Sequence, residues 1–148
     1  MKVKEFIDGF NRMHFIGVGA SDDIVKYIKK QLSIKDYLPF AEKKSLCADV
    51  LSACTTVANG YTHNDSVERY FAFTMAMIST YTNLELSDEL QDDYDILCKN
   101  GLLNFILDAI GTEYASCNNL LNMMMNDIVE DNSHYAIERL IKVLSVQS

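Results

Sequence analysis

The stretch DSVERYFAFTMAMISTYT, from Asp65 to Thr82, decides the fold. Its apolar side chains recur at helical spacing and fall on two faces. These are Tyr70, Phe73, Met77 and Tyr81 on one face, and Phe71, Met75 and Ile78 on the other. A helix that is apolar on two sides is covered on both. Asp65 and Glu68 supply an Asp-x-x-Glu variant of the capping box. The stretch therefore predicts a buried central helix over about residues 66–82.

The same three-to-four-residue spacing recurs along the rest of the chain. It predicts helices from Val3 to Phe10, from a Ser21 cap to about Leu32, and from Pro39 onward. Further helices are expected from a Ser87 cap to Asn100-Gly101, and from Leu103 to a stop at Gly111. We predict an all-α, single-domain bundle over residues 1–148, with seven or eight helices around the central one.

Three local assignments complete this prediction. The third helix is expected to place Cys47, Val50, Leu51, Cys54, Val57 and Ala58 inward. Residues 59–64 are expected to form a loop, without a β-hairpin. A long helix with Tyr114, Cys117, Leu121, Met124 and Ile128 inward is expected to end near Asn132. Ser133 would then cap a last helix whose inward residues are Ile137, Leu140, Ile141 and Leu144.

The bulk composition indicates a globular protein. Of the 148 residues, 49% are hydrophobic, which is enough for a single core. The opening residues MKVKEF lack the apolar stretch of a secretory signal, and no apolar run is long enough for a membrane span. Production in the cytosol is therefore expected. The four cysteines show no Cys-x-x-Cys spacing, so we expect buried free thiols.

Charge is distributed unevenly along the chain. Residues 1–44 carry nine basic and six acidic residues, whereas residues 45–148 carry four basic and fifteen acidic ones. The two balances, +3 and −11, sum to the net charge of −8. This polarity bears on how the surface meets partners rather than on any activity.

Two charged groups are candidate protein-interaction surfaces. The acidic strip consists of Glu85, Asp88, Glu89, Asp92, Asp93 and Asp95. It could mimic phosphates, dock a basic partner, bind a cation weakly, or simply be a solvated helix face. The basic patch consists of Lys26, Lys29 and Lys30, which Lys35, Lys43 and Lys44 could extend. This patch is too small for free nucleic acid to be an expected ligand.

The sequence contains no recognisable catalytic, metal-binding or cofactor-binding motif. His14, His63 and His134 are scattered and lack metal-ligand spacing. Gly17-x-Gly19 lacks the third glycine of a dinucleotide-binding turn. We therefore expect no catalytic residue, no metal and no cofactor, and predict that the protein is not an enzyme. Met123, Met124 and Met125 cannot all face one core, so at least one is expected at a contact surface or a second buried side.

Three stretches carry a resemblance to a known group of proteins. They are YLPFAEKKSL (Tyr37–Leu46), RYFAFTMAMISTYTNLEL (Arg69–Leu86) and YDILCKNGLLNFILDAIG (Tyr94–Gly111). In this order they resemble small proteins encoded by tailed bacteriophages of low-GC bacteria, often among virion structural and assembly genes. The resemblance covers roughly Tyr37 to the C-terminus. It is a pattern of apolar and aromatic positions, without a catalytic motif.

The resemblance implies a phage protein of the neck, connector or tail-assembly machinery, present in the host cytoplasm and, if structural, in the virion. Its partners would be other phage structural proteins or copies of itself, without a membrane. In a ring of copies, the basic patch of one would meet the acidic strip of the next. The alternative is a phage-encoded acidic inhibitor of a host nucleic-acid-binding protein. An enzyme whose site is assembled from distant residues is a third, weaker alternative.

Overall fold

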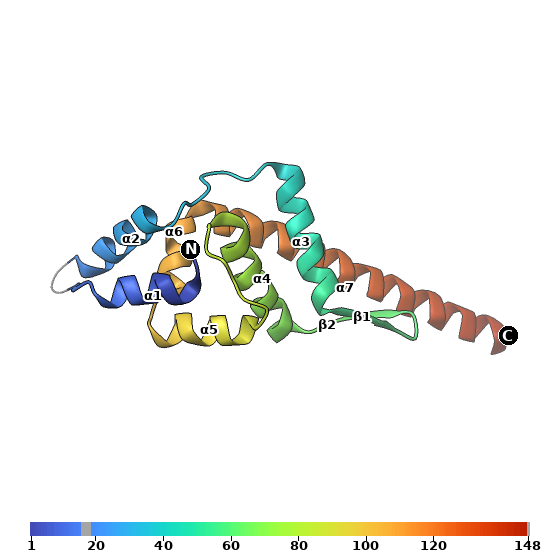
Figure 1. Cartoon of the computed structure of the whole chain (residues 1–148). Coiled ribbons are helices and arrows are strands. Elements are labelled where there is room, and N and C mark those ends of the chain that lie inside the picture. Colours follow the sequence, from blue (N-terminus) through green and yellow to red (C-terminus); the bar gives the residue numbers. More distant parts are fainter. Residues whose placement is uncertain (16–18, 148) are drawn as a thin grey trace.

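The computed structural model describes residues 1–15 and 19–147. Within these ranges the chain forms seven helices and one two-stranded sheet, which confirms the all-α prediction with a small exception (Figure 1). The helices are α1 (Val3–Asn11), α2 (Ala20–Gln31), α3 (Phe40–Cys54), α4 (Ser66–Tyr81), α5 (Leu90–Lys99), α6 (Leu103–Ile110) and α7 (Thr112–Gln147). The strands are β1 (Thr55–Ala58) and β2 (Tyr61–Asn64). Gly17 of the Gly17-x-Gly19 pair lies outside the described residues.

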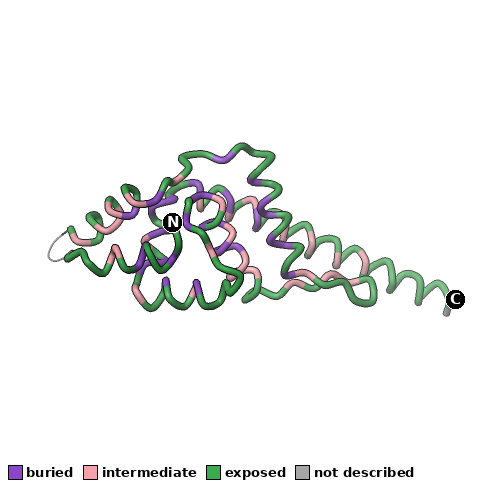
Figure 2. The backbone as a smooth tube through the Cα atoms, in the orientation of Figure 1, coloured by how far each residue is buried: buried purple, intermediate pink, exposed green. Residues whose placement is uncertain are grey.

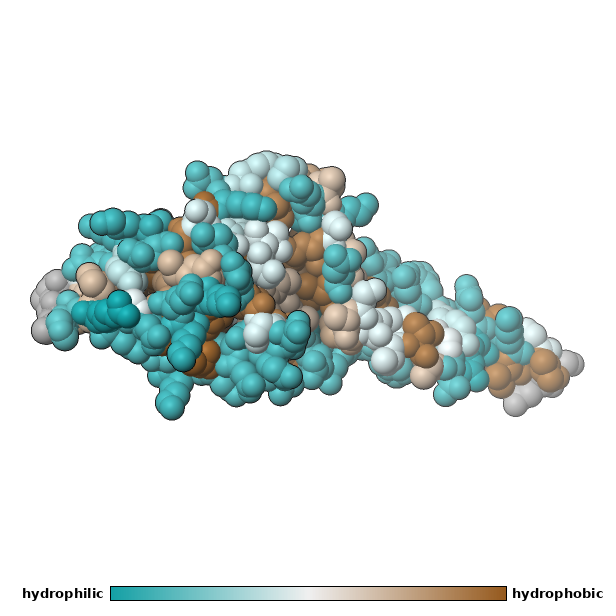
Figure 3. Space-filling view, in the orientation of Figure 1, coloured by the Kyte–Doolittle hydropathy of each residue, from teal (hydrophilic) through white to brown (hydrophobic). Residues whose placement is uncertain are grey.

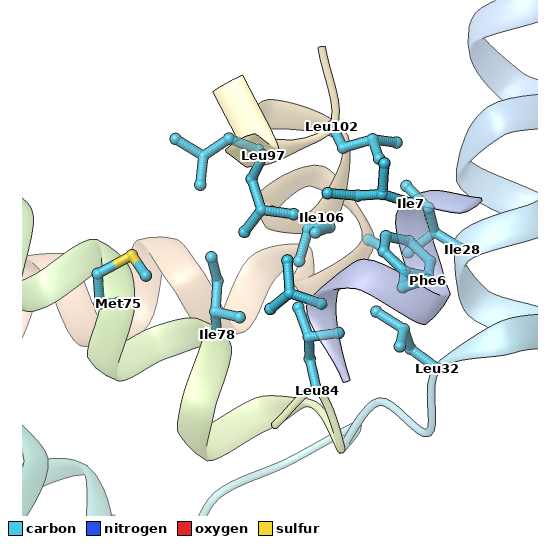
Figure 4. Packing of buried hydrophobic residues seen from close by; sticks show 13 residues of the cluster. Phe6, Ile7, Ile28, Leu32, Met75, Ile78, Leu84, Leu97, Leu102 and Ile106 are labelled. Atoms are coloured by element: carbon cyan, nitrogen blue, oxygen red, sulfur yellow. The ribbon is translucent and has the colours of Figure 1, made fainter. Parts of the chain in front are cut away.

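Helix α4 lies between two apolar clusters. Met75 and Ile78 pack on one side with residues of α1, α2, α5 and α6 (Figure 4). Phe73, Met77 and Tyr81 belong to the other cluster, with residues of α3 and α7. The prediction of a central helix buried on two sides is therefore confirmed for most of its length. Its early residue Tyr70 is an exception.

Tyr70 is 49% exposed, although the spacing predicts that it is buried. It lies near the beginning of α4, where its hydroxyl group is 3.0 Å from that of Tyr94. The two rings meet edge to face at the surface. A phenol ring can cover apolar surface while its hydroxyl group stays near water, so helical spacing alone did not fix its burial.

The predicted helix caps are correct in some places and shifted in others. The Asp65 side chain accepts hydrogen bonds from the backbone N–H groups of Val67 and Glu68, at 3.0 and 3.1 Å, as predicted. Helix α5 begins at Leu90, after the predicted Ser87 cap. Helix α2 begins before Ser21, because Gly19 adopts a positive φ of 91° at the N-cap.

The predicted loop over residues 59–64 is wrong, because residues 55–64 form a β-hairpin. Asn59 and Gly60 have φ values of 55° and 81°, the pair of positive angles that a type I′ turn requires. The register pairs Ala58 with Tyr61 across this turn. Helix α3 consequently ends at Cys54, and Val57, predicted to face inward, is 72% exposed. The predicted inward position of Ala58 is also wrong.

The predicted break near Asn132 is wrong as well, because α7 is one continuous helix of 36 residues. Ser133 does not cap a new helix. Its hydroxyl group donates to the carbonyl of Val129, one turn earlier, at 3.1 Å. The C-terminal half of α7 extends beyond the helical body, with the hairpin alongside it (Figure 1). We call the hairpin together with residues 129–147 the arm.

None of the described helices combines the length and the apolar character that crossing a membrane requires.

Candidate interaction surface

The hairpin is fastened to α7 by the side chain of Asn132. Ala58 and Tyr61 flank a two-residue turn, so the next pair, Val57 and Thr62, directs its backbone groups away from the hairpin interior. Asn132 accepts a hydrogen bond from the Thr62 N–H at 3.0 Å and donates to the Thr62 carbonyl at 2.8 Å. Its amide thus takes the place of a neighbouring strand.

Tyr135 fixes the end of the hairpin. Its ring meets that of Tyr61 edge to face, with centroids 4.8 Å apart. Its hydroxyl group donates to the carbonyl of Asn59 at 3.2 Å. A Cβ atom at Gly60 would collide with the Tyr135 ring, and φ at Gly60 is positive, so this position requires glycine on two grounds. The hairpin and α7 therefore form one packed unit.

An open groove of about 780 Å³ lies on this unit, between the hairpin and α7. Hairpin and α7 residues line it: Ala58, Asn59, Tyr61, His63, Tyr135, Glu138, Arg139 and Lys142. The Arg139 guanidinium lies 5.9 Å from the centroid of the Tyr135 ring. Because the groove carries acidic and basic side chains together, it does not favour a ligand of one charge.

The other side of α7 carries an exposed apolar face. Its members are Ile137, Leu140, Ile141 and Leu144, which are 56%, 59%, 57% and 57% exposed. Helical geometry places them opposite Tyr135, away from the hairpin. Their predicted inward position is therefore wrong: among the described residues, none buries them. Figure 2 shows the exposed end of α7, and Figure 3 shows hydrophobic residues near its tip.

The predicted basic patch is exposed at its three core lysines, but not at every lysine considered as an extension. Lys26, Lys29 and Lys30 are exposed on α2, as expected. Lys43, considered as an extension, is buried on α3, which corrects that expectation. It is drawn inward by an ion pair with Glu113, whose carboxylate oxygen lies 2.9 Å from the lysine nitrogen.

The acidic strip is likewise divided by the fold. The exposed members are Asp88, Glu89, Asp92 and Asp95. Glu85 is also exposed, but its carboxylate lies 3.6 Å from the amino group of Met1. Asp93 is buried, contrary to the prediction, because it accepts hydrogen bonds from the Ser87 N–H at 2.7 Å and the Ser87 hydroxyl at 3.0 Å. The carboxylate of Asp93 thus fixes the approach to α5.

We expect Asp93→Ala to destabilise the protein by about 1–3 kcal/mol, because it leaves the two Ser87 donors without their acceptor. The matched control is Asp92→Ala, which removes a neighbouring exposed carboxylate and should change stability by less than about 0.5 kcal/mol. Urea unfolding followed by circular dichroism measures both. Equal effects of the two substitutions would contradict the inward role of Asp93.

The most extensive buried polar cluster joins α3, α4 and α7. One carboxylate oxygen of Glu113 accepts hydrogen bonds from the Leu38 N–H at 2.7 Å and the Tyr81 hydroxyl at 3.1 Å. The other accepts from Lys43 at 2.9 Å. The Lys43 nitrogen also lies 4.4 Å from the centroid of the Tyr37 ring. Sequence patterning missed this cluster, because residues 43 and 113 carry no local signal of their pairing.

The pKa values in this cluster follow from its contacts. Burial acts to raise the pKa of Glu113, but hydrogen bonds from Lys43, Leu38 and Tyr81 outweigh it and lower the pKa below its ordinary value. The hydrogen bond to Glu113 raises the pKa of Lys43, against the effect of burial. Both groups are thus held in their charged forms, each bound to the other. The arrangement ties three helices together.

Three of the four cysteine thiols are buried and one is exposed. Cys47, Cys54 and Cys117 are buried free thiols, as predicted, whereas Cys98 is exposed. The Cys47 thiol donates to the carbonyl of Cys117 at 3.4 Å. Burial, with a contribution from Cys117, raises the pKa of Cys47 to about 11. Cys47 is therefore a protonated packing residue at neutral pH.

The remaining candidates are distributed over the surface. Met123 is 63% exposed, whereas Met124 and Met125 pack against the second cluster, which confirms that the three methionines diverge. His63 lines the groove of the arm, and His134 lies 3.8 Å from Glu130. Over the described ranges, no three His, Cys, Asp or Glu side chains gather where they could hold a metal ion.

No family model, curated protein or solved structure matches the chain. The resemblance to a phage family stays a prediction.

Proposed function

We propose that this chain is a non-enzymatic structural or assembly protein of a tailed bacteriophage, in the neck, connector or tail region, acting through contacts between proteins. The observation that carries the proposal is the apolar face of the arm. Its four side chains are more than half exposed on a helix that extends beyond the body. A contiguous row of exposed apolar side chains on a projecting helix supports docking of another molecule.

A further observation supports the proposal. The phage setting is supported by the three stretches that resemble phage virion and assembly proteins. The buried Lys43–Glu113 pair has a structural role, because its groups are bound to each other rather than directed into an open groove. The acidic inhibitor is a weaker candidate, because Asp93 faces inward and Glu85 lies beside the amino group of Met1.

The experiment uses the phage that encodes this chain. Its gene is deleted and supplied in trans, as the wild type or as Leu140→Asp/Ile141→Asp. We expect the wild type to restore infectious particles, and the double variant to leave unassembled or defective particles. Val67→Glu is the matched control, because Val67 is exposed on α4 and does not belong to the apolar face of the arm. Normal infectious particles from the deletion alone would contradict the proposal.

A further inference from the structure

We propose that the apolar face of the arm pairs with the same face of a second copy, in an antiparallel, two-fold symmetric dimer. This inference rests on the proposed function, since it names the partner for the same surface. It concerns Ile137, Leu140, Ile141 and Leu144, which the hairpin leaves exposed on the far side of α7.

The spacing of these four residues is self-complementary. The segment reads Ile-x-x-Leu-Ile-x-x-Leu, so its apolar positions are the same in both directions along the helix. An antiparallel copy places Ile137 opposite Leu144 of its partner, and Leu140 opposite Ile141. A two-fold interface pairs one patch with itself, and this spacing permits such a pairing.

The charges and the shape of the arm permit this pairing. Arg139 and Lys142 line the groove on the hairpin side, so like charges are kept away from the paired face. With the two-fold axis between Leu140 and Ile141, Gln147 of each copy lies opposite His134 of the other. The last described residue of α7 that packs on the core is Ile128. Gln147 of the partner therefore lies about 9 Å from the body along the helix axis.

The buried area indicates a reversible dimer. A full Leu, Ile or Val side chain presents roughly 100 Å² of apolar surface, so each half-exposed member retains about 55 Å². The four members then offer about 220 Å² per copy, and about 440 Å² for the pair. At an apolar share of about 65%, the whole interface is about 680 Å². This is the size of transient complexes rather than obligate ones.

Sedimentation of the purified full-length protein, from about 5 to about 500 µM, tests the pairing over the range expected of such an interface. We expect the mass to rise with concentration from the 16.8 kDa monomer to the dimer. Leu140→Asp/Ile141→Asp should stay monomeric, and Val67→Glu should behave as the wild type. A circular dichroism spectrum and a melting temperature equal to those of the wild type verify that the double variant folds. A wild type that stays monomeric, forms a higher oligomer, or dimerises regardless of the double substitution would overturn the proposal.

Disulfide trapping tests the antiparallel register. Cys98 is first replaced by serine, because it is the exposed native thiol among the described cysteines. Ile137→Cys and Leu144→Cys are then prepared separately in this background and oxidised with oxidised glutathione. Each alone should stay monomeric on a non-reducing gel, whereas their mixture should form a covalent dimer. Crosslinking of each variant alone, with no gain on mixing, would overturn the register.

These tests need no phage, so the two proposals can fail separately. A monomeric protein that is still required for particle assembly through its arm would leave the proposed function intact and remove the second copy as its partner. A dimer that is dispensable for particle formation would do the reverse.

Discussion

Glu113→Gln is expected to lower the free energy of unfolding by about 3–5 kcal/mol, because it leaves the Lys43 ammonium buried without its counter-ion. The Lys43 and Glu113 side chains are only 9% and 11% exposed, so water cannot replace the lost partner without rearrangement. For a chain of this length the loss corresponds to a melting temperature lower by roughly 10 °C. Differential scanning calorimetry at pH 7 measures it.

A double substitution separates the ion pair from the packing. Lys43→Met/Glu113→Met removes both charges while keeping much of the volume, and should recover most of the stability lost in the single variant. It does not return the acceptor that Glu113 provides to the Leu38 N–H, so recovery should be incomplete. A double variant less stable than Glu113→Gln would contradict the interpretation that an unpaired buried charge causes the loss.

The same carboxylate gives the wild type a defined dependence on pH. The pKa of Glu113 is lower in the folded protein than its ordinary value. Its contribution to stability is therefore fully present above the ordinary carboxyl pKa, and is lost as the pH falls through the folded-state value. Glu113→Gln lacks this titration. Unfolding in urea from pH 7 down to pH 3 should show the gap between wild type and variant narrowing with acid.

Leu97→Ala is expected to cost about 2–5 kcal/mol, because it removes a completely buried side chain from the first cluster and leaves a cavity between α5 and its neighbours. The neighbouring residue Ile96 is 37% exposed and provides the matched control. Ile96→Ala loses less apolar contact and should cost at most about 1 kcal/mol. Thermal unfolding followed by circular dichroism compares the two variants, and similar costs would show that α5 is rotated from the orientation described.

The helical body could be predicted from sequence because its signals are local. The two apolar faces of α4 lie within one short stretch, and both are covered by other helices. Asp65 caps the helix that directly follows it. Gly101 and Gly111 have positive φ values where α5 and α6 end, which glycine adopts without the steric cost of a side chain.

The hairpin was not predicted, although Asn59-Gly60 is a strong turn signal. Val57 and Ala58 follow Cys54 at distances of three and four residues, so they continue the helical spacing of α3 in the sequence. The strands are short, and β2 gains its second set of partners from Asn132, 70 residues from Thr62. Local spacing favoured the helix, and a distant side chain stabilises the strand.

The candidate site could be predicted only in part. The spacing of Ile137, Leu140, Ile141 and Leu144 correctly indicates a helix with an apolar side, but a pattern does not tell whether its own chain covers that side. Lys43 shows the same limit in reverse. In the sequence, nothing distinguishes Lys43 from the lysines that are exposed. It is buried because folding brings Glu113 next to it as a partner.

The continuity of α7 has a mechanical consequence. From Ile128, the last described residue of α7 that packs on the core, to Leu144 the helix spans about 24 Å, and the hairpin braces the near part of this length. The helix is therefore held at its core end and projects at the other. A rotation of about 10° at Ile128 would move Leu144 through about 4 Å. Conversely, a load applied at the tip is transmitted along the same rigid element to Glu113, where three helices are joined.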